Sequence, residues 1–223
     1  MKLGLVGKNI SHSKSQQMYE EILNRPVDYT LLDFAKENDI PSLKSLFEKD
    51  GFTGISVTAP YKNYVFKNIK ADRFASELEA VNCMKFYKGQ LLGINTDLLA
   101  TINILERYLD EYEDIVILGS GAMYRTCSLA LRHLEKSYTQ YSRKKDGALE
   151  NFDLTKHQNS LVINSCSREF NFNGKISDDC LFWDLNYNHQ YNQSSLSDKC
   201  QYIDGIELLK LQAIYALEFW GIN

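Results

Sequence analysis

The sequence predicts an α/β protein with two layers of mainly parallel strands, and three observations lead to that prediction. In the first third of the chain, apolar runs alternate with segments of helical spacing, in the order strand, helix, strand, helix, strand. Farther along, the apolar run at residues 115–118 enters a glycine turn at residues 119–121, which is typical of a buried parallel strand. The length of 223 residues, 44% of them hydrophobic, suffices for one large domain or two small ones.

Composition excludes several classes of protein. A net charge of −4 gives no broad positive field for nucleic acid. The five cysteines include no Cys-x-x-Cys and the four histidines form no short pair, so we expect neither a disulfide framework nor a metal site. The sequence has no apolar run of membrane-spanning length and no N-terminal leader pattern. We therefore expect a soluble cytoplasmic protein without a nucleic-acid or membrane partner.

The first half of the chain is expected to form one α/β layer. Ser13 can cap a helix that runs through Met18, and hydroxyls at a helix N-terminus also suit an anion. Lys88-Gly89 supplies the turn of a hairpin. The other expected elements are strands at residues 2–7, 27–34 and 52–57, helices at 39–49 and 72–78, and hairpin strands at 81–87 and 90–95.

The stretch Ser56-Val57-Thr58-Ala59-Pro60-Tyr61-Lys62 organises this layer. Pro60 cannot donate to a strand ladder, so the third strand should stop there. Thr58 and Lys62 then lie at a strand-to-helix turn, where sheets commonly present ligand-binding groups. Asp97 likewise follows a strand, so Lys62 and Asp97 are candidates for one catalytic pair. The alternative is an ordinary salt bridge, worth about 0–1 kcal/mol when isolated on a surface.

The second half of the chain is expected to form a nucleotide-binding layer. Residues 144–159 are too few for a full crossover helix, so this layer should be trimmed. The expected elements are helices at residues 98–109, 123–134 and 205–220, and strands at 115–118, 137–141, 160–164, 181–185 and 202–203.

The glycine turn predicts a dinucleotide site. Gly119 and Gly121 match the fingerprint, whereas Tyr124 occupies its third glycine position, so the motif is weak without its strand and helix context. An NAD-binding fold places an acidic residue about 20 residues farther on. Here the sequence is Ser142-Arg143-Lys144-Lys145, whose cations suit a 2′-phosphate, which favours NADP over NAD. The alternative is a solvated basic loop.

Seven motifs follow one another along nearly the whole chain. They are Ser11-His12-Ser13-Lys14-Ser15, residues 54–62, Ala80-Val81-Asn82, Gly93-Ile94-Asn95-Thr96-Asp97, Gly119-Ser120-Gly121, Asp184-Leu185-Asn186-Tyr187 and Gln212-Ala213. Any one of them could arise by chance, but the ordered set is specific. Together they resemble the shikimate dehydrogenase family, which includes the quinate/shikimate dehydrogenases.

The resemblance implies two α/β domains. An N-terminal substrate domain would comprise residues 1–97 and a closing helix at 205–223 that packs back on it, and a Rossmann-like NADP domain would comprise residues 98–204. It implies reversible NADP-dependent reduction of 3-dehydroshikimate to shikimate in aromatic amino acid biosynthesis, by a monomer or a homodimer.

The resemblance also implies roles for individual residues. Lys62 and Asp97 would be the catalytic pair. The substrate carboxylate would bind Ser13 and Ser15, its hydroxyls would bind Thr58, Asn82 and Gln212, and Tyr187 would line the pocket. NADP (NADPH in the direction of reduction) would contact Gly119, Ser120, Gly121, Ala122, Ser142, Arg143, Lys144 and Gly205.

Departures from the family pattern concentrate in the cofactor set. Glu207 replaces a glycine of the closing segment, and Ser142 replaces an asparagine. Two alternatives therefore stay open. The protein acts on quinate or an analogue, or it is a non-catalytic ligand-binding relative with a weakened nucleotide site.

Overall fold

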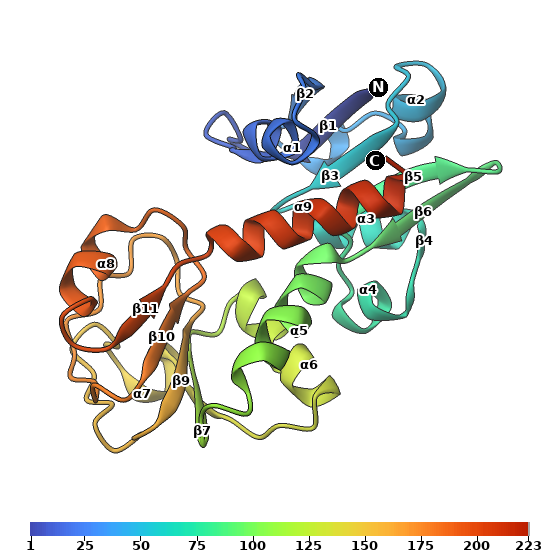
Figure 1. The fold of residues 1–223 in the computed structure, drawn as a ribbon. Helices are drawn as coiled ribbons and strands as arrows, with labels where there is room; N and C mark the ends of the chain where they lie inside the picture. The colour runs from blue at the N-terminus through green and yellow to red at the C-terminus, as the bar shows by residue number, and fades with distance from the viewer. Residues whose placement is uncertain (223) are drawn as a thin grey trace. The chain divides into compact units, whose positions relative to one another are not determined.

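The computed structural model describes residues 1–222 and divides into two compact units (Figure 1). Unit 1 is Met1–Leu99 together with the chain from Lys210 onward, and unit 2 is Ala100–Leu209. Both boundaries fall inside helices, α5 (Thr96–Tyr108) and α9 (Ile206–Trp220). The assignment of the units to substrate and nucleotide stays a prediction.

Unit 1 contains a six-stranded sheet in the order β2-β1-β3-β5-β6-β4. Its strands are β1 (Lys2–Gly7), β2 (Asp28–Asp33), β3 (Gly54–Val57), β4 (Lys70–Ala71), β5 (Cys83–Tyr87) and β6 (Gln90–Ile94). β1 runs parallel to β2 and β3, whereas β5 runs antiparallel to β3 and β6, so the sheet is mixed. The β5–β6 turn has positive φ at Lys88 (48°) and Gly89 (80°), which matches the expected hairpin turn.

The helices of unit 1 correct part of the sequence reading. They are α1 (Ser15–Leu23), the 3₁₀ turn η1 (Glu37–Asp39), α2 (Leu43–Glu48), α3 (Lys62–Asn68) and α4 (Arg73–Leu78). The helix expected at residues 39–49 begins only at Leu43, because Pro41 lacks an N–H and disfavours helical backbone in the residue before it. α3 is the helix that follows the strand-to-helix turn expected at Lys62. Its bounds were not predicted, because Val65 is its one fully buried position and gives no helical period.

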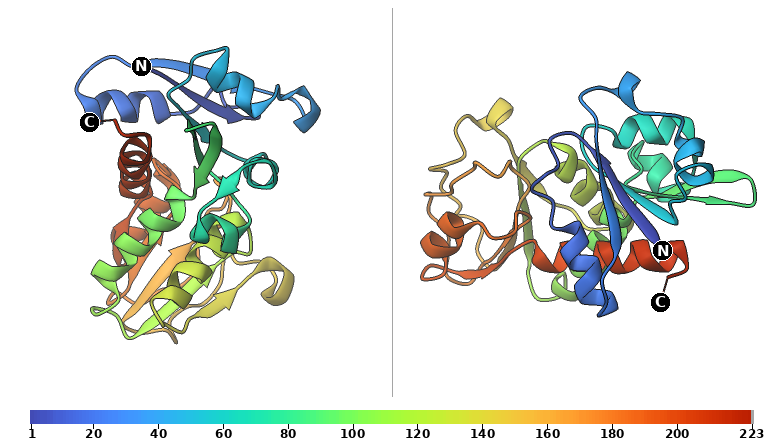
Figure 2. Two further views of the ribbon diagram at one scale, coloured as in Figure 1. Left: turned by 90° about the vertical axis from the view of Figure 1, so that its right-hand side faces the viewer. Right: turned by 90° about the horizontal axis from the view of Figure 1, so that it is seen from above.

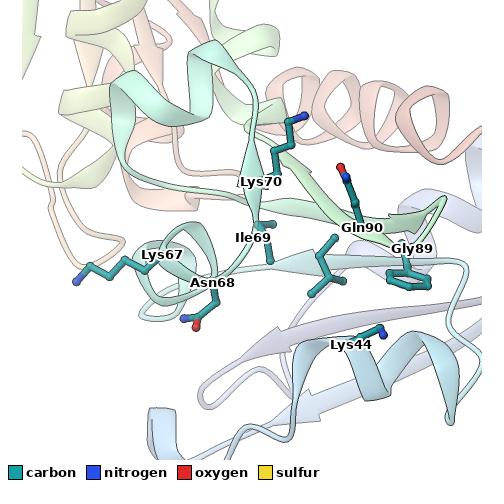
Figure 3. A pocket seen from close by; sticks show the side chains of 9 residues that line it. Lys44, Lys67, Asn68, Ile69, Lys70, Gly89 and Gln90 are labelled. Atoms are coloured by element: carbon teal, nitrogen blue, oxygen red, sulfur yellow. The ribbon is translucent and has the colours of Figure 1, made fainter.

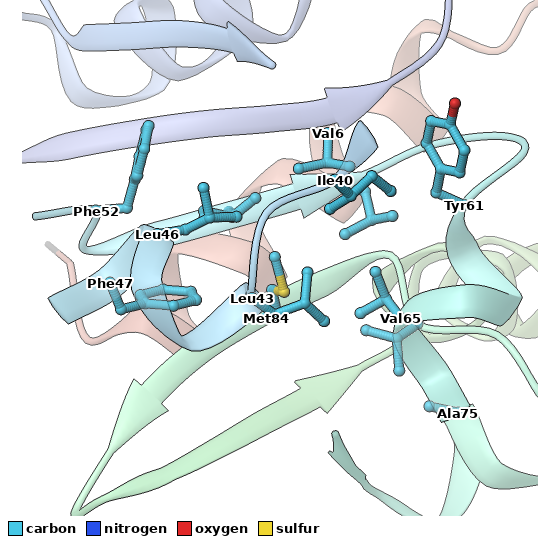
Figure 4. Packing of buried hydrophobic residues seen from close by; sticks show 13 residues of the cluster. Val6, Ile40, Leu43, Leu46, Phe47, Phe52, Tyr61, Val65, Ala75 and Met84 are labelled. Atoms are coloured by element: carbon cyan, nitrogen blue, oxygen red, sulfur yellow. The ribbon is translucent and has the colours of Figure 1, made fainter. Parts of the chain in front are cut away.

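The core of unit 1 lies between the sheet and the short helices α2 and α3. Figure 4 shows side chains of α2, including Leu43, Leu46 and Phe47, packed toward Val6 and Met84 of the sheet. Burial of this set fixes the ends of β3 and the start of α3, which carry candidate site residues.

The closing helix is tied to unit 1 by Trp220. Its Nε1 donates to the carbonyl oxygen of Met84 at 3.0 Å, and its ring lies 5.6 Å from that of Tyr19, centroid to centroid. A Cβ on Gly54 would lie 2.2 Å from the Trp220 ring, so only glycine admits this contact. Truncation of a buried tryptophan typically costs about 3–5 kcal/mol, which makes this contact a main tie for α9.

Unit 2 contains a parallel five-stranded sheet in the order β11-β10-β9-β7-β8. Its strands are β7 (Asp114–Leu118), β8 (Thr139–Tyr141), β9 (Ser160–Asn164), β10 (Leu181–Asp184) and β11 (Gln201–Ile203). Besides parts of α5 and α9, its helices are α6 (Ala122–His133), α7 (Arg143–Asp146) and α8 (Gln190–Leu196). The strand order reverses between β7 and its neighbours β8 and β9. Open α/β sheets bind ligands at such a point, beside the carboxyl ends of the strands.

The connection from β8 to β9 is short, as the sequence indicates. Beyond the single turn of α7 it contains no further helix, and its irregular course can be followed in the two views of Figure 2. His157 fastens it to the sheet, because Nε2 bonds the Tyr141 hydroxyl at 2.8 Å and Nδ1 lies 2.5 Å from Asp114 Oδ2. Within residues 1–222, no helix is long and apolar enough to cross a membrane.

Candidate active site

Lys62 and Asp97 come together in unit 1, as the sequence predicts for a catalytic pair. Lys62 Nζ donates to Asp97 Oδ2 at 2.6 Å, although the residues are 35 positions apart in the chain. The side chains keep 26% and 16% of their surface exposed. The pair is therefore ordered, yet open enough for a ligand or water to reach the ammonium group.

Asp97 is placed by a capped helix start. The Asn95 side chain accepts the N–H of Leu98 at 3.0 Å and donates to the carbonyl oxygen of Ala80 at 2.8 Å. Asn95 thus acts as the N-cap of α5 and ties the helix start to the rest of unit 1. A carboxylate in the first turn of a helix is stabilised by about 0.3–1 kcal/mol through the helix dipole. Asparagine followed by aspartate two residues later is the local signal for this arrangement.

Lys62 is placed by the turn between β3 and α3. The Thr58 N–H donates to the carbonyl oxygen of Val6, and the Tyr61 N–H donates to that of Thr58 at 3.0 Å. The buried Tyr61 ring reaches Phe34, whose carbonyl oxygen accepts the phenol hydrogen at 2.5 Å. The Ala59–Pro60 peptide bond is cis. These bonds leave Thr58 half-buried beside the turn that presents Lys62.

Thr96 joins two of the predicted substrate-binding residues, and sequence reasoning missed it. Asn82 Oδ1 accepts the N–H of Thr96 at 2.7 Å, and Asn82 Nδ2 donates to Thr96 Oγ1 at 2.9 Å. Thr96 Oγ1 lies 3.4 Å from Gln212 Oε1, to which it can donate its single hydrogen. Asn82, Thr96 and Gln212 thus form a polar row next to Asp97. The only local signal for Thr96 is its place between Asn95 and Asp97.

Replacing Thr96 with valine is expected to lower the free energy of unfolding by about 1–3 kcal/mol, because the buried Asn82 amide then loses a hydrogen-bond partner. Chemical denaturation of both proteins measures the difference. Thr53→Val, an exposed position in the same unit, is the matched control and should unfold like the wild type. Equal stability of all three proteins would contradict this role of Thr96.

The predicted carboxylate-binding serines also lie together in unit 1. The Ser13 hydroxyl is 3.1 Å from that of Ser15 and accepts the Ser15 N–H at 3.2 Å, where α1 begins. Asp33 anchors the preceding loop, because its two carboxylate oxygens accept the N–H groups of Asn9 and Ile10 at 2.9 and 3.1 Å. The loop therefore presents two neighbouring hydroxyls from a fixed backbone.

Two tyrosines that the sequence analysis did not single out, the buried Tyr19 and the half-buried Tyr29, add polar groups. The Tyr19 hydroxyl lies 2.9 Å from that of Ser56. The phenolic oxygen of Tyr29 is buried without a hydrogen-bond partner among the described residues, and the hydroxyls of Ser15 and Ser56 partly oppose the rise of its pKa. Burial raises the pKa of both phenols far above its usual range, so both keep their protons at neutral pH.

The glycine turn of unit 2 leaves the start of α6 accessible. Gly119 has a φ of 115°, and a Cβ there would lie 2.6 Å from Ser165 Oγ. Gly121 is the N-cap of α6, with open space beside it and no side chain bonded to the helix amides. With Ser120 between the glycines and Ala122 as the first helical residue, the N–H groups of the first turn are available to an anion.

The basic segment after β8 lies at the same sheet edge. Tyr141 pairs with Leu118 across parallel strands, so Ser142 follows β8 where the glycine turn follows β7. Ser142 is buried, and its N–H donates to Asp146 Oδ2 at 2.8 Å. Arg143 and Lys144 then begin α7. The segment is thus a helical turn with its own acidic neighbour, and its basic side chains are exposed. Its role as a cofactor site and the alternative of a solvated basic segment both stay predictions.

Tyr187 and Gly205 belong to unit 2, whereas Lys62 and Asp97 belong to unit 1. The Tyr187 ring centroid lies 5.2 Å from Arg168 Cζ. A Cβ on Gly205 would lie 2.2 Å from the carbonyl oxygen of Leu185, so the chain needs glycine there to begin α9. The roles of Tyr187 and Gly205 in binding stay predictions.

A separate groove of about 750 Å³ on unit 1 does not include the candidate pair. It is lined by Lys44, Lys67, Asn68, Ile69, Lys70, Phe86, Gly89, Gln90 and Leu91. Figure 3 shows its lysine side chains pointing in different directions, and Lys44 is paired with Glu48 at 3.1 Å. These ammonium groups do not converge on one anion, so the groove receives no functional assignment.

Known proteins resemble this chain over nearly its whole length. The model of the shikimate dehydrogenase substrate binding domain matches residues 5–84. The NADP(+) shikimate dehydrogenase of Clostridium botulinum is 24% identical over 249 residues, which cover 99% of this chain and 96% of that protein. The corresponding protein of Methanococcus aeolicus is 27% identical over 254 residues, covering 98% and 91%.

A solved structure agrees in fold. Shikimate 5-dehydrogenase from Thermus thermophilus, crystallised with NADP(H) and shikimate, matches with a TM-score of 0.76 at 19% identity, over 99% of this chain and 93% of that one. The two-domain α/β architecture is therefore shared, including a parallel sheet in the second unit. With the domain match and the full-length relatives, the chain is similar to shikimate dehydrogenases over nearly its whole length.

Proposed function

We propose that the chain catalyses the reversible, NADP-dependent reduction of 3-dehydroshikimate to shikimate. The observation that carries this proposal is the 2.6 Å contact between Lys62 and Asp97, in a unit that includes the substrate-binding-domain match. Reduction of a ketone requires a proton donor at the carbonyl oxygen and groups that orient the substrate. Lys62 offers the first, and the neighbouring polar row offers the second.

Substrate binding is assigned to side chains of unit 1. The hydroxyls of Ser13 and Ser15 can both donate to the carboxylate of the substrate. Asn82, Gln212 and Thr58 provide amide and hydroxyl groups for the ring hydroxyls. Because Asn82 and Gln212 are both bonded through Thr96, their orientation is set before a ligand arrives.

Lys62 and Asp97 supply the proton chemistry. When bound, NADPH supplies the hydride that reaches the carbonyl carbon. The Lys62 ammonium donates a hydrogen bond to the carbonyl oxygen and gives up a proton as negative charge develops there. Asp97 holds the ammonium at 2.6 Å and so orients the acid. The 26% exposure of Lys62 lets the neutral amine regain a proton from water.

The cofactor site fits residues of unit 2. The open N-terminus of α6 at Gly121 and Ala122 suits the pyrophosphate, because its amides have no competing side-chain cap. Arg143 and Lys144, at the end of β8, are assigned to the 2′-phosphate of NADP. Gly119 and Ser120 complete the turn.

Replacing Arg143 with alanine is expected to raise the KM for NADP roughly tenfold or more while changing the KM for NAD little, because only NADP carries the 2′-phosphate. Steady-state kinetics with each cofactor measures the two constants. Arg132→Ala, near the far end of α6, is the matched loss of one positive charge and should leave both unchanged. An equal rise for both cofactors would remove Arg143 from the phosphate.

A second candidate is a ligand-binding relative without turnover. Tyr124 stands in place of the third fingerprint glycine, and its hydroxyl lies 3.1 Å from that of Tyr138, so this position carries a bulky side chain where the fingerprint has none. Calorimetric binding of shikimate without binding of NADP would favour this candidate. A substrate panel containing shikimate, quinate and an aminated analogue, with both cofactors, separates the enzymes of the family from one another.

The wider setting follows from the same proposal. A shikimate dehydrogenase would act in aromatic amino acid biosynthesis, and the expected location is the cytoplasm, as a monomer or a homodimer. Fractionation of cells and light scattering of the purified protein test location and assembly.

A further inference from the structure

Arg143 forms an ion pair with an acidic side chain that lies outside its immediate sequence neighbourhood. Its Nη2 donates to Glu150 Oε1, seven positions farther along the chain. The guanidinium carbon also lies 6.0 Å from the centroid of the buried Phe170 ring. Arg143 therefore has two side-chain contacts, and Glu150 occupies one of its donors.

The Glu150 carboxylate lies at the sheet edge that is assigned to the cofactor. β7 and β8 run parallel with Leu118 opposite Tyr141, and the Gly119 N–H donates to the carbonyl oxygen of Tyr141 at 2.8 Å. Ser142 and Arg143 therefore start beside the glycine turn, and the ion pair brings the Glu150 carboxylate to the same place. The other acid of this segment, Asp146, accepts the N–H of Ser142.

Glu150 carries a full negative charge under ordinary conditions. Its own backbone N–H, and then the Arg143 guanidinium, lower the pKa of the carboxyl group. Its side chain is 31% exposed, and Arg143 is 60% exposed, so solvent and ligands reach the pair. Lys144 and Lys145 have no ion-pair partner among residues 1–222. Glu150 therefore neutralises Arg143, which is the one residue of this basic segment with a planar guanidinium that can bind a phosphate through two N–H groups.

We propose that Glu150 is a specificity-determining residue that competes with the cofactor 2′-phosphate for Arg143 and thereby narrows the preference for NADP over NAD. The inference rests on the proposed function, because it assumes that this edge binds the adenosine end of the cofactor. A carboxylate next to an incoming phosphate repels it and occupies a donor that the phosphate needs. NAD lacks the phosphate and experiences neither effect.

The test compares the full-length wild type with Glu150→Gln by isothermal titration calorimetry, with NADP+, NAD+ and adenosine 2′-phosphate as probes. Glutamine keeps the size and can still accept from Arg143, but it removes the charge. We expect the Kd for NADP+ and adenosine 2′-phosphate to fall roughly tenfold and that for NAD+ to change less than about twofold. The gain should shrink as salt is added.

Two further variants make the result specific. Glu111→Gln removes one charge just before β7, at the opposite end of the strand from the glycine turn, and should leave all three Kd values unchanged. In the Arg143→Ala background, Glu150→Gln should give no comparable gain. Because exposed ion pairs contribute little to stability, Glu150→Gln is expected to fold normally.

Three outcomes would overturn the inference. Unchanged or weaker NADP+ binding by Glu150→Gln means that the carboxylate does not compete with the phosphate. A gain of the same size without Arg143 means that the competition is not for this guanidinium group. Failure of the wild type to bind either dinucleotide overturns the cofactor assignment itself, and the inference with it.

Discussion

Replacement of Lys62 by alanine is expected to lower kcat by roughly 10²–10⁴ while altering the KM for shikimate little, the range for loss of a general acid–base group. The ammonium of Lys62 is the proton donor assigned to the carbonyl oxygen, and the structure holds it at 2.6 Å from Asp97. Steady-state kinetics in both directions, at saturating NADP or NADPH, gives kcat and KM separately.

Lys67→Ala is the matched control for this experiment. Lys67 lies in the last turn of the same helix, α3, and is exposed, so the variant loses the same charge from the same element. Its kcat should equal that of the wild type. Undiminished turnover by Lys62→Ala would refute the assignment of the acid.

Asp97→Asn is expected to give the second-largest effect, a fall in kcat of roughly 10–10². Asparagine keeps the shape but removes the charge that orients the ammonium. Because the two side chains act as one unit, the Lys62→Ala/Asp97→Asn double variant should be no slower than Lys62→Ala within about threefold. Kinetics of the two single variants and the double variant measures this.

Independent action of Asp97 would give a different pattern. The two losses would then multiply, and the double variant would be slower than either single variant by the full product. That outcome would contradict the role of Asp97 as an orienting group for Lys62.

Much of the candidate site was predictable because its residues sit at the ends of elements with local signals. Pro60 marks the end of β3, and Asp97 follows the run that forms β6, so Lys62 and Asp97 could each be placed just after a strand. Their 2.6 Å contact depends on the packing of β3 and β6 around β5, which no local pattern encodes.

Other features of the site could not be predicted, because they depend on contacts between distant segments that no local sequence pattern connects. Thr96 belongs to a motif of the sequence, but its role appears only where Asn82 and Gln212 contact it from other elements. Glu150 lies in an irregular stretch after α7, so its pairing with Arg143 has no sequence signature. By contrast, Pro41 is a local signal that the helix expected at residues 39–49 must begin later, so the predicted start of that helix was wrong.

The most direct measurement is a spectrophotometric assay of the purified full-length protein with shikimate and NADP+ or NAD+, following the formation of reduced nicotinamide. The account predicts shikimate-dependent formation of NADPH that is lost in Lys62→Ala and retained in Lys67→Ala. No reduced nicotinamide from the wild type with either cofactor, under conditions in which it binds shikimate, would contradict the account.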